Sequence, residues 1–261
     1  MSKTVRQPHA VLDLPSRQLK GMKIERLLDL AARRSPLRML EIGTGSGGIA
    51  HYFGTHPGLR CEVTAVDVVD QRLIHDGYRF QLVHDTTLPF SDSSFDVVLS
   101  NHVIEHVGDR DAQLAHLCEV GRVMAPEGVG YLAVPNRWML IEPHYRLALL
   151  SWWPRRWRSR YLKWRRGIAF YDCEPLTLQQ AETLLHDAGF RFVNKGIEAL
   201  RLTLALEYAP RSIYRRIFDH VPDILIRSIS AVIPTLIYRF ESGAAPSPVD
   251  MRPSCPADIA R

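Results

Sequence analysis

The chain has 261 residues, of which 46% are hydrophobic, and its formal net charge is +5. This length suits one medium-sized domain with additions, and the apolar fraction is sufficient for a core of that size. Four cysteines lie far apart without a C-x-x-C pair, which argues against a zinc knuckle or a disulfide framework and fits a reducing, cytoplasmic compartment. We expect neither a secretory signal in the polar N-terminus nor a membrane span, since no uninterrupted apolar run reaches roughly 18 residues.

The first 135 residues alternate between predicted strands and helices. Residues 16–34 show the helical spacing of apolar residues, and Ser35-Pro36 ends this helix. Further helices are expected to begin near Gly48 and to span residues 111–124. Short apolar strands are predicted at residues 37–42, 61–66, 80–83, 95–100 and 129–134. This alternation predicts right-handed crossovers and a doubly wound parallel sheet, which binds ligands beyond the carboxyl ends of its strands.

The remainder of the chain departs from this regular pattern. We expect a helix at residues 177–188, two strands at 190–193 and 200–206, and an amphipathic helix over 212–240 that two prolines interrupt. The predicted organisation is an N-terminal helix (1–35), an α/β domain (36–208) with a basic–aromatic insert (135–175), an amphipathic helical extension (209–241) and a disordered tail (242–261). The predicted fold class is therefore α/β, with seven strands that are mostly parallel.

A glycine-rich sequence, LEIGTGSGG at residues 40–48, lies where the first strand meets the next helix. Its glycines let the backbone approach a ligand closely and adopt angles that other residues avoid. Asp67 ends the second strand at about the distance expected for a ribose-binding acid. Together these features predict a nucleoside ligand rather than a merely tight turn.

Two carboxylates favour S-adenosylmethionine (SAM) over a nicotinamide dinucleotide. Glu41 precedes the first glycine by two residues, where it can engage an ammonium group but would repel a pyrophosphate. Asp85 ends the third strand, where it can accept a hydrogen bond from the adenine amino group. The alternative interpretation is a nicotinamide-binding or non-catalytic nucleoside-binding protein.

The passage LVHDTTLPFSDSSFDVVLSN, residues 82–101, extends the pattern beyond the glycines. With the glycine loop, CEVGRVMAPEGVGYLAV and LTLQQAETLLHDAGF, it resembles the class I SAM-dependent methyltransferases of the ubiquinone and biotin biosynthetic type, over residues 37–190. The resemblance implies a Rossmann-like, doubly wound sheet of seven mostly parallel strands with an inserted acceptor or lid region. It also implies a type 11-like methyltransferase domain that uses SAM as its methyl donor.

The resemblance assigns roles to residues that follow the strands. The cofactor-binding residues that it implies are Glu41, Gly43, Gly45, Gly47, Asp67, Val68, Asp85, Thr86 and Asn101. Asp67 would accept both ribose hydroxyls, Val68 would pack on adenine, and Asp85 would face the adenine amino edge. Asn101 and His102 would line the pocket near the methyl group.

Two histidines, His102 and His144, are candidates for a general base. A base is needed only if the acceptor is a hydroxyl that must lose a proton. A structural, hydrogen-bonded role is the alternative for both histidines. The sequence H-x-x-E-H at residues 102–106 also has the spacing of an inverted zinc-protease motif. Because short patterns recur by chance, and this one begins at the expected methyltransferase pocket, we predict no metal.

A basic–aromatic segment, SWWPRRWRSRYLKWRR at residues 151–166, contains six arginines, one lysine, four tryptophans and no acid. Indole rings settle at the headgroup level of membranes, and arginines meet lipid phosphates. We therefore expect residues 152–166 to contact an anionic membrane, and a small or lipid-linked hydroxyl acceptor to be methylated at the cytoplasmic face. An ordinary lid with a solvated basic face is the alternative, and an RNA acceptor is a lesser one.

Overall fold

A computed structural model describes residues 13–207, 212, 220–222 and 232–243 of the chain. A central seven-stranded sheet has the strand order β3-β2-β1-β4-β5-β9-β8. Its strands are β1 (Leu37–Ile42), β2 (Cys61–Asp67), β3 (Arg79–Leu82), β4 (Phe95–Asn101), β5 (Met124–Pro135), β8 (Phe190–Asn194) and β9 (Thr235–Ser242). Neighbouring strands from β3 to β5 are parallel, whereas β9 is antiparallel to both β5 and β8. The predicted α/β fold class is confirmed.

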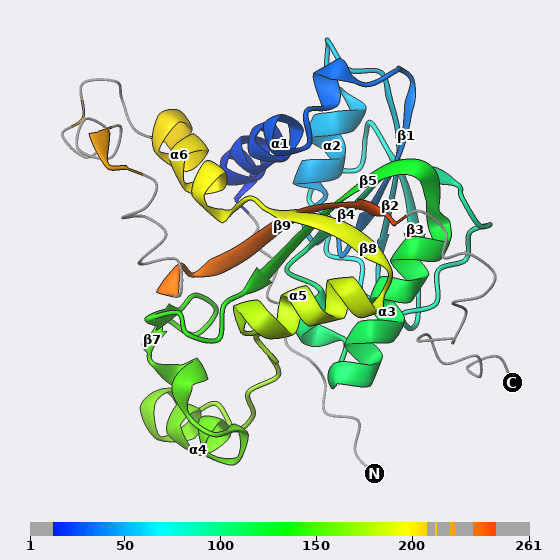
Figure 1. Ribbon diagram of the computed structural model, residues 1–261. Helices are drawn as coiled ribbons and strands as arrows, with labels where there is room; N and C mark the ends of the chain where they lie inside the picture. Colours follow the sequence, from blue (N-terminus) through cyan, green and yellow to red (C-terminus); the bar gives the residue numbers. More distant parts are fainter. Residues whose placement is uncertain (1–12, 208–211, 213–219, 223–231, 244–261) are drawn as a thin grey trace, which may run out of the picture.

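Helices cover both faces of the sheet (Figure 1). The helices on one face are α1 (Leu14–Leu28), α2 (Gly48–Gly54) and α6 (Gly196–Glu207), and those on the other are α3 (Arg110–Val123) and α5 (Leu178–Asp187). Successive residues of β1 enter different cores, because Met39 packs with α1 and α2 while Leu40 packs with α3 and α5. Burial on both faces explains why the inner strands are continuous apolar runs in the sequence.

Local capping chemistry sets the helix ends. Asp13 caps α1 by accepting a hydrogen bond from Ser16 N at 3.2 Å. The helix ends at Leu28 because Asp29 adopts a left-handed conformation, and residues 30–32 form a short 3₁₀ turn instead of continuing it. Thr177 caps α5 in a reciprocal arrangement with Gln180, at the start of the helix expected from residue 177.

The strand predicted at residues 200–206 was wrong, because these residues form the second half of α6. A short apolar run fits a buried helix as well as a strand. Contacts with α1 decide between them: Lys23 Nζ donates to Thr203 Oγ1 at 3.0 Å and to Glu207 Oε1 at 3.2 Å. The α6 helix therefore packs beside α1 and leaves the seventh position of the sheet to another segment.

The amphipathic extension predicted at residues 209–241 was also wrong at its end, where residues 235–242 form β9. Leu236, Tyr238 and Phe240 are buried at intervals of two residues, which is the period of a strand. The β9 strand inserts between β5 and β8 and supplies the seventh strand. The rest of the predicted extension lies largely, and the predicted tail almost wholly, outside the described residues.

The insert after β5 forms a small unit of its own beyond the carboxyl edge of the sheet (Figure 1). It consists of β6 (Ile141–Glu142), β7 (Leu147–Ala148), a 3₁₀ turn (Leu150–Trp152) and α4 (Arg155–Arg166). A separate apolar cluster holds it together and includes Tyr145, Leu150, Leu162 and Tyr171. Within the described residues, no helix has both the length and the apolar character needed to cross a membrane.

The contact between β5 and β9 gives a stability test. Gly130 lies opposite Phe240 in the antiparallel register, and a methyl group at Gly130 would collide with the buried Phe240 ring. We expect Gly130→Ala to lower the free energy of unfolding by about 1–3 kcal/mol through overpacking. Urea denaturation measures this loss. The double variant with Phe240→Leu should lose less free energy of unfolding than the sum of the two single losses, because the smaller side chain relieves the collision. Simple addition of the two losses in the double variant would contradict the contact.

Candidate functional site

The glycine loop follows β1 at the carboxyl edge of the sheet. Gly43, Gly45 and Gly47 have φ angles of 72°, 54° and 80°, which residues with side chains rarely adopt. A methyl group at Gly43 would collide with Val103, and one at Gly47 would collide with Tyr78. Backbone conformation therefore favours glycine at all three positions, and close packing excludes a side chain at Gly43 and Gly47 as well.

Asp67 joins the end of β2 to the glycine loop. Its Oδ2 accepts a hydrogen bond from Gly45 N at 2.9 Å, and its Oδ1 accepts one from Val68 N at 2.7 Å. Asp67 Oδ1 also accepts a longer hydrogen bond from Val69 N at 3.4 Å. A carboxylate offers about four acceptor positions, so acceptor capacity remains for a ribose hydroxyl. Asp67 therefore fixes the shape of the loop, and its contact with the ribose stays a prediction.

Glu41 is buried beneath the same loop, with 2% of its surface exposed. Burial raises the pKa of Glu41 to about 8, against the opposing effects of the Thr44 hydrogen bond at 2.8 Å and the nearby Arg17 charge. Arg17 comes from α1, and burial lowers its pKa in turn. A cation that approaches Glu41 would favour its ionised form.

Three buried polar atoms of the residues around the loop have no hydrogen-bond partner in the part of the chain that the structure describes: Arg17 Nε, Ser46 Oγ and Asn101 Oδ1. Buried polar atoms are almost always paired in folded proteins, so unpaired ones gathered at one place indicate contacts to a ligand. A donor, a hydroxyl and an acceptor suit a ligand with a carboxylate, an amine and hydroxyl groups. The residues present therefore fit SAM.

The predicted adenine-side residues follow β3, beside the end of β2. Val83 N donates to Asp67 O at 2.9 Å, which holds the two segments together. Asp85 is exposed and Thr86 partly exposed, while Val68 has 53% of its surface exposed. An apolar side chain beside an acid is a suitable surface for an adenine ring, and these three contacts stay predictions.

The chain turns sharply where β4 ends. His102 has a φ of 59°, a left-handed conformation that is uncommon for a residue with a side chain, and its N donates to Ala133 O at 2.9 Å. This turn brings the following residue, Val103, against Gly43. Strained residues of this kind concentrate at functional sites. The predicted pocket residues Asn101 and His102 therefore lie beside the glycine loop.

A group of histidines and acids, here the histidine cluster, lies where the insert meets the turn after β4. Its members are His102, Glu105, His106, Glu142, His144, Asp172 and Cys173. His102 Nδ1 lies 3.2 Å from Glu105 Oε1, and His144 Nδ1 lies 2.8 Å from Glu142 Oε1. The His102 and His144 ring centroids are 6.5 Å apart. The structure therefore brings both predicted base candidates together and gives each a buried carboxylate.

Burial and charge act in opposite directions within the histidine cluster. Burial lowers the pKa of His144, but the hydrogen bond and charge of Glu142, with further carboxylates, outweigh it and raise the pKa overall. Burial likewise raises the pKa of Glu105, but the His102 hydrogen bond and the histidine charges lower it overall. Hydrogen bonds and charge within the cluster therefore outweigh burial for both His144 and Glu105.

The predicted basic–aromatic surface lies on the 3₁₀ turn and α4 of the insert, with one exception. Arg158 is 1% exposed, and it donates from Nε to Trp153 O at 2.9 Å and from Nη1 to Glu174 Oε1 at 3.2 Å. The expectation that this arginine faces a membrane was wrong, because Arg158 lies on the face by which α4 packs against the rest of the insert. The four tryptophans of the segment are exposed, as expected.

Several residues of the site were missed by sequence reasoning. They are Arg17, Ser46, Glu142, Asp172 and Cys173, while Glu105 and His106 entered only through the zinc-protease pattern. Ser46 lies within the glycine-rich sequence, where attention to the glycines passed over it. The others belong to no motif and meet the site only through the packing of α1 and of the insert. An arginine in the first turn of a helix has an ordinary surface interpretation, so Arg17 carried no signal that would have identified it.

Comparisons with known proteins agree with this geometry. A family model described as a methyltransferase domain matches residues 16–195. Norajmaline N-methyltransferase from Rauvolfia serpentina is 28% identical over 102 residues, which cover 36% of this chain and 35% of that protein. Ubiquinone biosynthesis O-methyltransferase from Parvibaculum lavamentivorans is 26% identical over 170 residues, which cover 59% of each. The chain thus spans less than two thirds of the length of these relatives.

Solved structures share the fold at low sequence identity. The plantazolicin methyltransferase BpumL, in complex with a monoazolic desmethylPZN analog and SAH, has a TM-score of 0.54 and 14% identity, covering 88% of this chain and 85% of its own. A chain from the complex of the Haloferax volcanii Trm112 methyltransferase activator has a TM-score of 0.52 and 17% identity, covering 92% and 100%. The sheet order, the glycine loop and the family match agree. The chain belongs to the methyltransferase-domain family, and residues 16–195 form its class I SAM-dependent methyltransferase domain.

Proposed function

We propose that the protein transfers the methyl group of SAM to a hydroxyl of a lipid-linked or lipid-like acceptor at an anionic membrane surface. The observation that carries the proposal is the exposed basic–aromatic face of α4, beyond the edge of the sheet where ligands bind in this fold. One relative is named an O-methyltransferase and another an N-methyltransferase, so the choice of oxygen rests on the histidine cluster described below.

One stripe of α4 is aromatic and is flanked by arginines. Trp157, Tyr161 and Trp164 follow helical spacing on one side, and the two tryptophans are 44% and 76% exposed. The Arg160 guanidinium lies 5.7 Å from the centroid of Trp157, and that of Arg165 lies 5.4 Å from Trp164. Rings with cations beside them suit the boundary between lipid headgroups and acyl chains.

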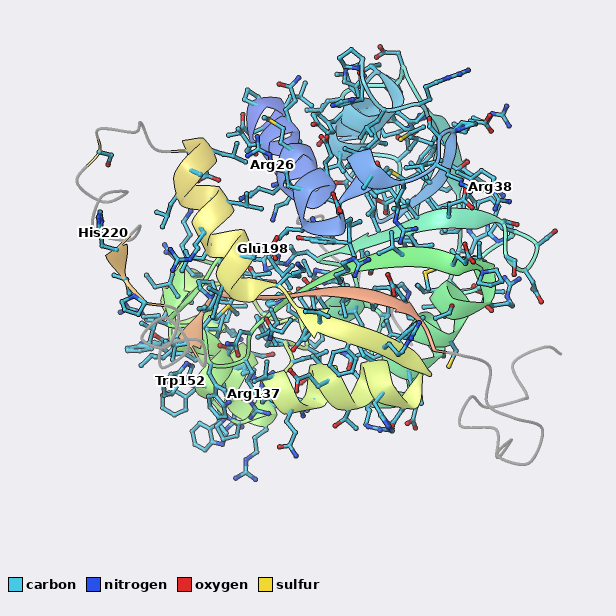
Figure 2. The ribbon with its side chains drawn as sticks, turned by 45° about the horizontal axis from the view of Figure 1, so that its top comes forward. Arg26, Arg38, Arg137, Trp152, Glu198 and His220 are labelled. Carbon is cyan, nitrogen blue, oxygen red and sulfur yellow. The ribbon has the colours of Figure 1, made fainter. Side chains whose placement is uncertain are left out.

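Exposed apolar side chains continue from α4 over the neighbouring turns of the insert. They are Trp138, Leu140, Ile141, Leu149, Trp152, Trp153 and Phe170. Figure 2 shows Arg137 and Trp152 on the side of the molecule opposite Arg38, which lies at the amino end of β1. Exposed apolar side chains gathered on one side, with basic residues among them, are typical of membrane contacts. This surface supports an acceptor that is presented at a lipid layer.

Arg17 and Glu41 suit the two charged ends of the aminoacyl group of SAM. The carboxylate of SAM matches the Arg17 guanidinium, whose Nε is buried without a partner. The ammonium of SAM matches Glu41, which ionises when a cation is close. Bound in this way, the aminoacyl group would hold the methyl group at a defined position for an in-line transfer, which depends mainly on orientation.

The histidine cluster suits an acceptor that must lose a proton. His102 and His144 each contact a buried carboxylate, which orients the ring so that its second nitrogen can accept a proton from a hydroxyl. A hydroxyl needs a base as it attacks the methyl carbon, whereas a neutral amine attacks with its own lone pair. The cluster therefore favours oxygen over nitrogen as the methylated atom.

Membrane contact is measured by cosedimentation with vesicles of phosphatidylcholine and phosphatidylglycerol at low salt. We expect the protein to bind, and Arg156→Gln/Arg160→Gln to lower the partition coefficient by about 10- to 30-fold, since each surface arginine contributes about 1 kcal/mol. The matched control, Arg60→Gln/Arg79→Gln, removes the same charge from exposed residues at the amino ends of β2 and β3. Equal weakening by both pairs, or RNA binding without vesicle binding, would contradict the proposal.

The pKa of Glu41 predicts a pH dependence of cofactor affinity. With a pKa of about 8, Glu41 is mostly neutral at pH 6 and half ionised at pH 8, so the ammonium of S-adenosylhomocysteine (SAH) binds better as pH rises. We expect the Kd from isothermal titration to fall by about tenfold or more between these pH values. In Glu41→Gln, which stays neutral, the Kd should be independent of pH in this range. A wild-type Kd that is equally insensitive would contradict the Glu41 contact.

The carboxylate contact of Arg17 is tested with a second titration. We expect Arg17→Gln to weaken SAH binding by about 10- to 100-fold, because a hydrogen bond to a charged group contributes about 1.5–3 kcal/mol. Arg26→Gln is the matched control, because Arg26 is an exposed arginine in the last turn of the same helix (Figure 2). Equal affinities of the two variants would show that Arg17 does not hold the cofactor.

A further inference from the structure

The histidine cluster buries negative charge without a lysine or arginine partner. The Glu105 and Glu142 side chains are 0% exposed, and their charged contacts are with histidines. In the part of the chain that the structure describes, neither carboxylate forms an ion pair with lysine or arginine. Burial of carboxylates in this way is strongly unfavourable unless a cation compensates it. The cluster is therefore suited to a positive ion.

Potential ligand atoms of Glu105, His106 and His144 all lie within 4.8 Å of one another. Ligands bound to one zinc ion at about 2.0–2.2 Å are themselves roughly 3–3.5 Å apart, so small side-chain adjustments would bring these three onto one ion. Glu105 Oε1 contacts His102 Nδ1 at 3.2 Å, whereas Glu105 Oε2 is buried and has no hydrogen-bond partner among the described residues. An unpaired buried carboxylate oxygen within such a group points to a cation ligand.

Two further groups hold the histidine rings in place. Glu142 Oε1 lies 2.8 Å from His144 Nδ1, and Cys173 Sγ lies 3.8 Å from His106 Nδ1. A proton on each Nδ1 places the lone pair on Nε2, and His106 Nε2 lies 4.0 Å from Glu105 Oε1. Metal-binding histidines commonly donate a hydrogen bond from their second ring nitrogen to a carboxylate, as His144 can to Glu142. The hydrogen bonds therefore orient the rings as ligands.

We propose that Glu105, His106 and His144 bind a divalent transition-metal ion, with zinc as its representative. Two histidines and one carboxylate are the ligand set of catalytic zinc sites and of non-haem iron sites, which keep at least one position open. This set differs from the zinc-protease pattern in the sequence. Residues 104–106 form a 3₁₀ turn rather than an α-helix, and the second histidine comes from the insert.

The ion would connect the insert to the methyltransferase core. His144 belongs to the insert, while Glu105 and His106 follow β4, so the ion would hold the two parts together. An acceptor hydroxyl bound at the open position of the ion would be polarised by its charge, which would lower the pKa of that hydroxyl. This last consequence rests on the proposed O-methylation, whereas metal binding itself does not.

Titration of the chelator-treated full chain with zinc(II) and cobalt(II) tests the site. We expect one ion per chain, with binding weakened more than about 100-fold by Glu105→Gln or His144→Ala, since loss of an outer-shell partner alone costs about 10- to 100-fold. Glu142→Gln, which removes an outer-shell partner of His144, should weaken metal binding by only about 10- to 100-fold. The matched control is His186→Ala, because His186 is an exposed histidine on α5 and its loss should leave binding unchanged.

SAH titration of each variant shows whether its cofactor site is still folded. Absence of bound metal, or unchanged affinity in folded Glu105→Gln and His144→Ala, would overturn the proposal. A cobalt–thiolate absorption band that Cys173→Ser abolishes would also overturn it, because the ion would then bind through the thiol. Vesicle binding is measured separately, so failure of the membrane proposal is distinguishable from failure of the metal site.

Discussion

The parallel pairing of β1 with β2 and β4 is the constraint on which the site depends. In this register Ile42 lies opposite both Val66 and Ser100, so the three strands end at the same edge of the sheet. The glycine loop, Asp67 and Asn101 therefore leave the sheet side by side, although they are far apart in the chain. The hydrogen bond from Gly45 N to Asp67 then fixes the first loop to the second strand.

Charge is separated between the inside of the site and its outer surface. Glu41, Glu105 and Glu142 are buried near the carboxyl edge, where they disfavour anions and favour cations. SAM carries an ammonium and a sulfonium, so a cationic donor suits this interior. The outside of the insert has the opposite character, because α4 contains no acid and exposes arginines beside tryptophans. The two surfaces suit a cationic cofactor and an anionic boundary respectively.

The insert is attached to the core by polar contacts as well as by packing. Arg155 and Arg158 both pair with Glu174, at 3.1 and 3.2 Å, and Glu174 N donates to Glu105 O at 2.8 Å. These contacts connect α4 to the turn after β4 through one short segment. The surface that we propose to meet lipid is thus connected through Glu174 to the turn after β4, where the pocket residues are predicted. A rigid attachment of this kind would position an acceptor more accurately than a loose lid.

The sequence by itself determined the fold class, the position of the glycine loop and the acids at the end of the second strand and after the third. These features are local: apolar runs define buried strands, and glycine and acid spacing defines a nucleoside turn. The secondary structure of two further segments was decided by tertiary contacts. The apolar run at residues 200–206 is compatible with helix or strand, and its contacts with α1 made it helical. Pairing with β5 and β8 made residues 235–242 a strand.

Only the tertiary structure decided which polar residues complete the site. Arg17 reaches Glu41 because α1 packs beside the glycine loop, and His144 reaches Glu105 because the insert folds back over the turn after β4. The same packing buried Arg158, which the basic sequence around it had grouped with exposed arginines. Spacing along a chain predicts contacts within one helix or one strand, whereas contacts between distant segments depend on which surfaces the folded core brings together.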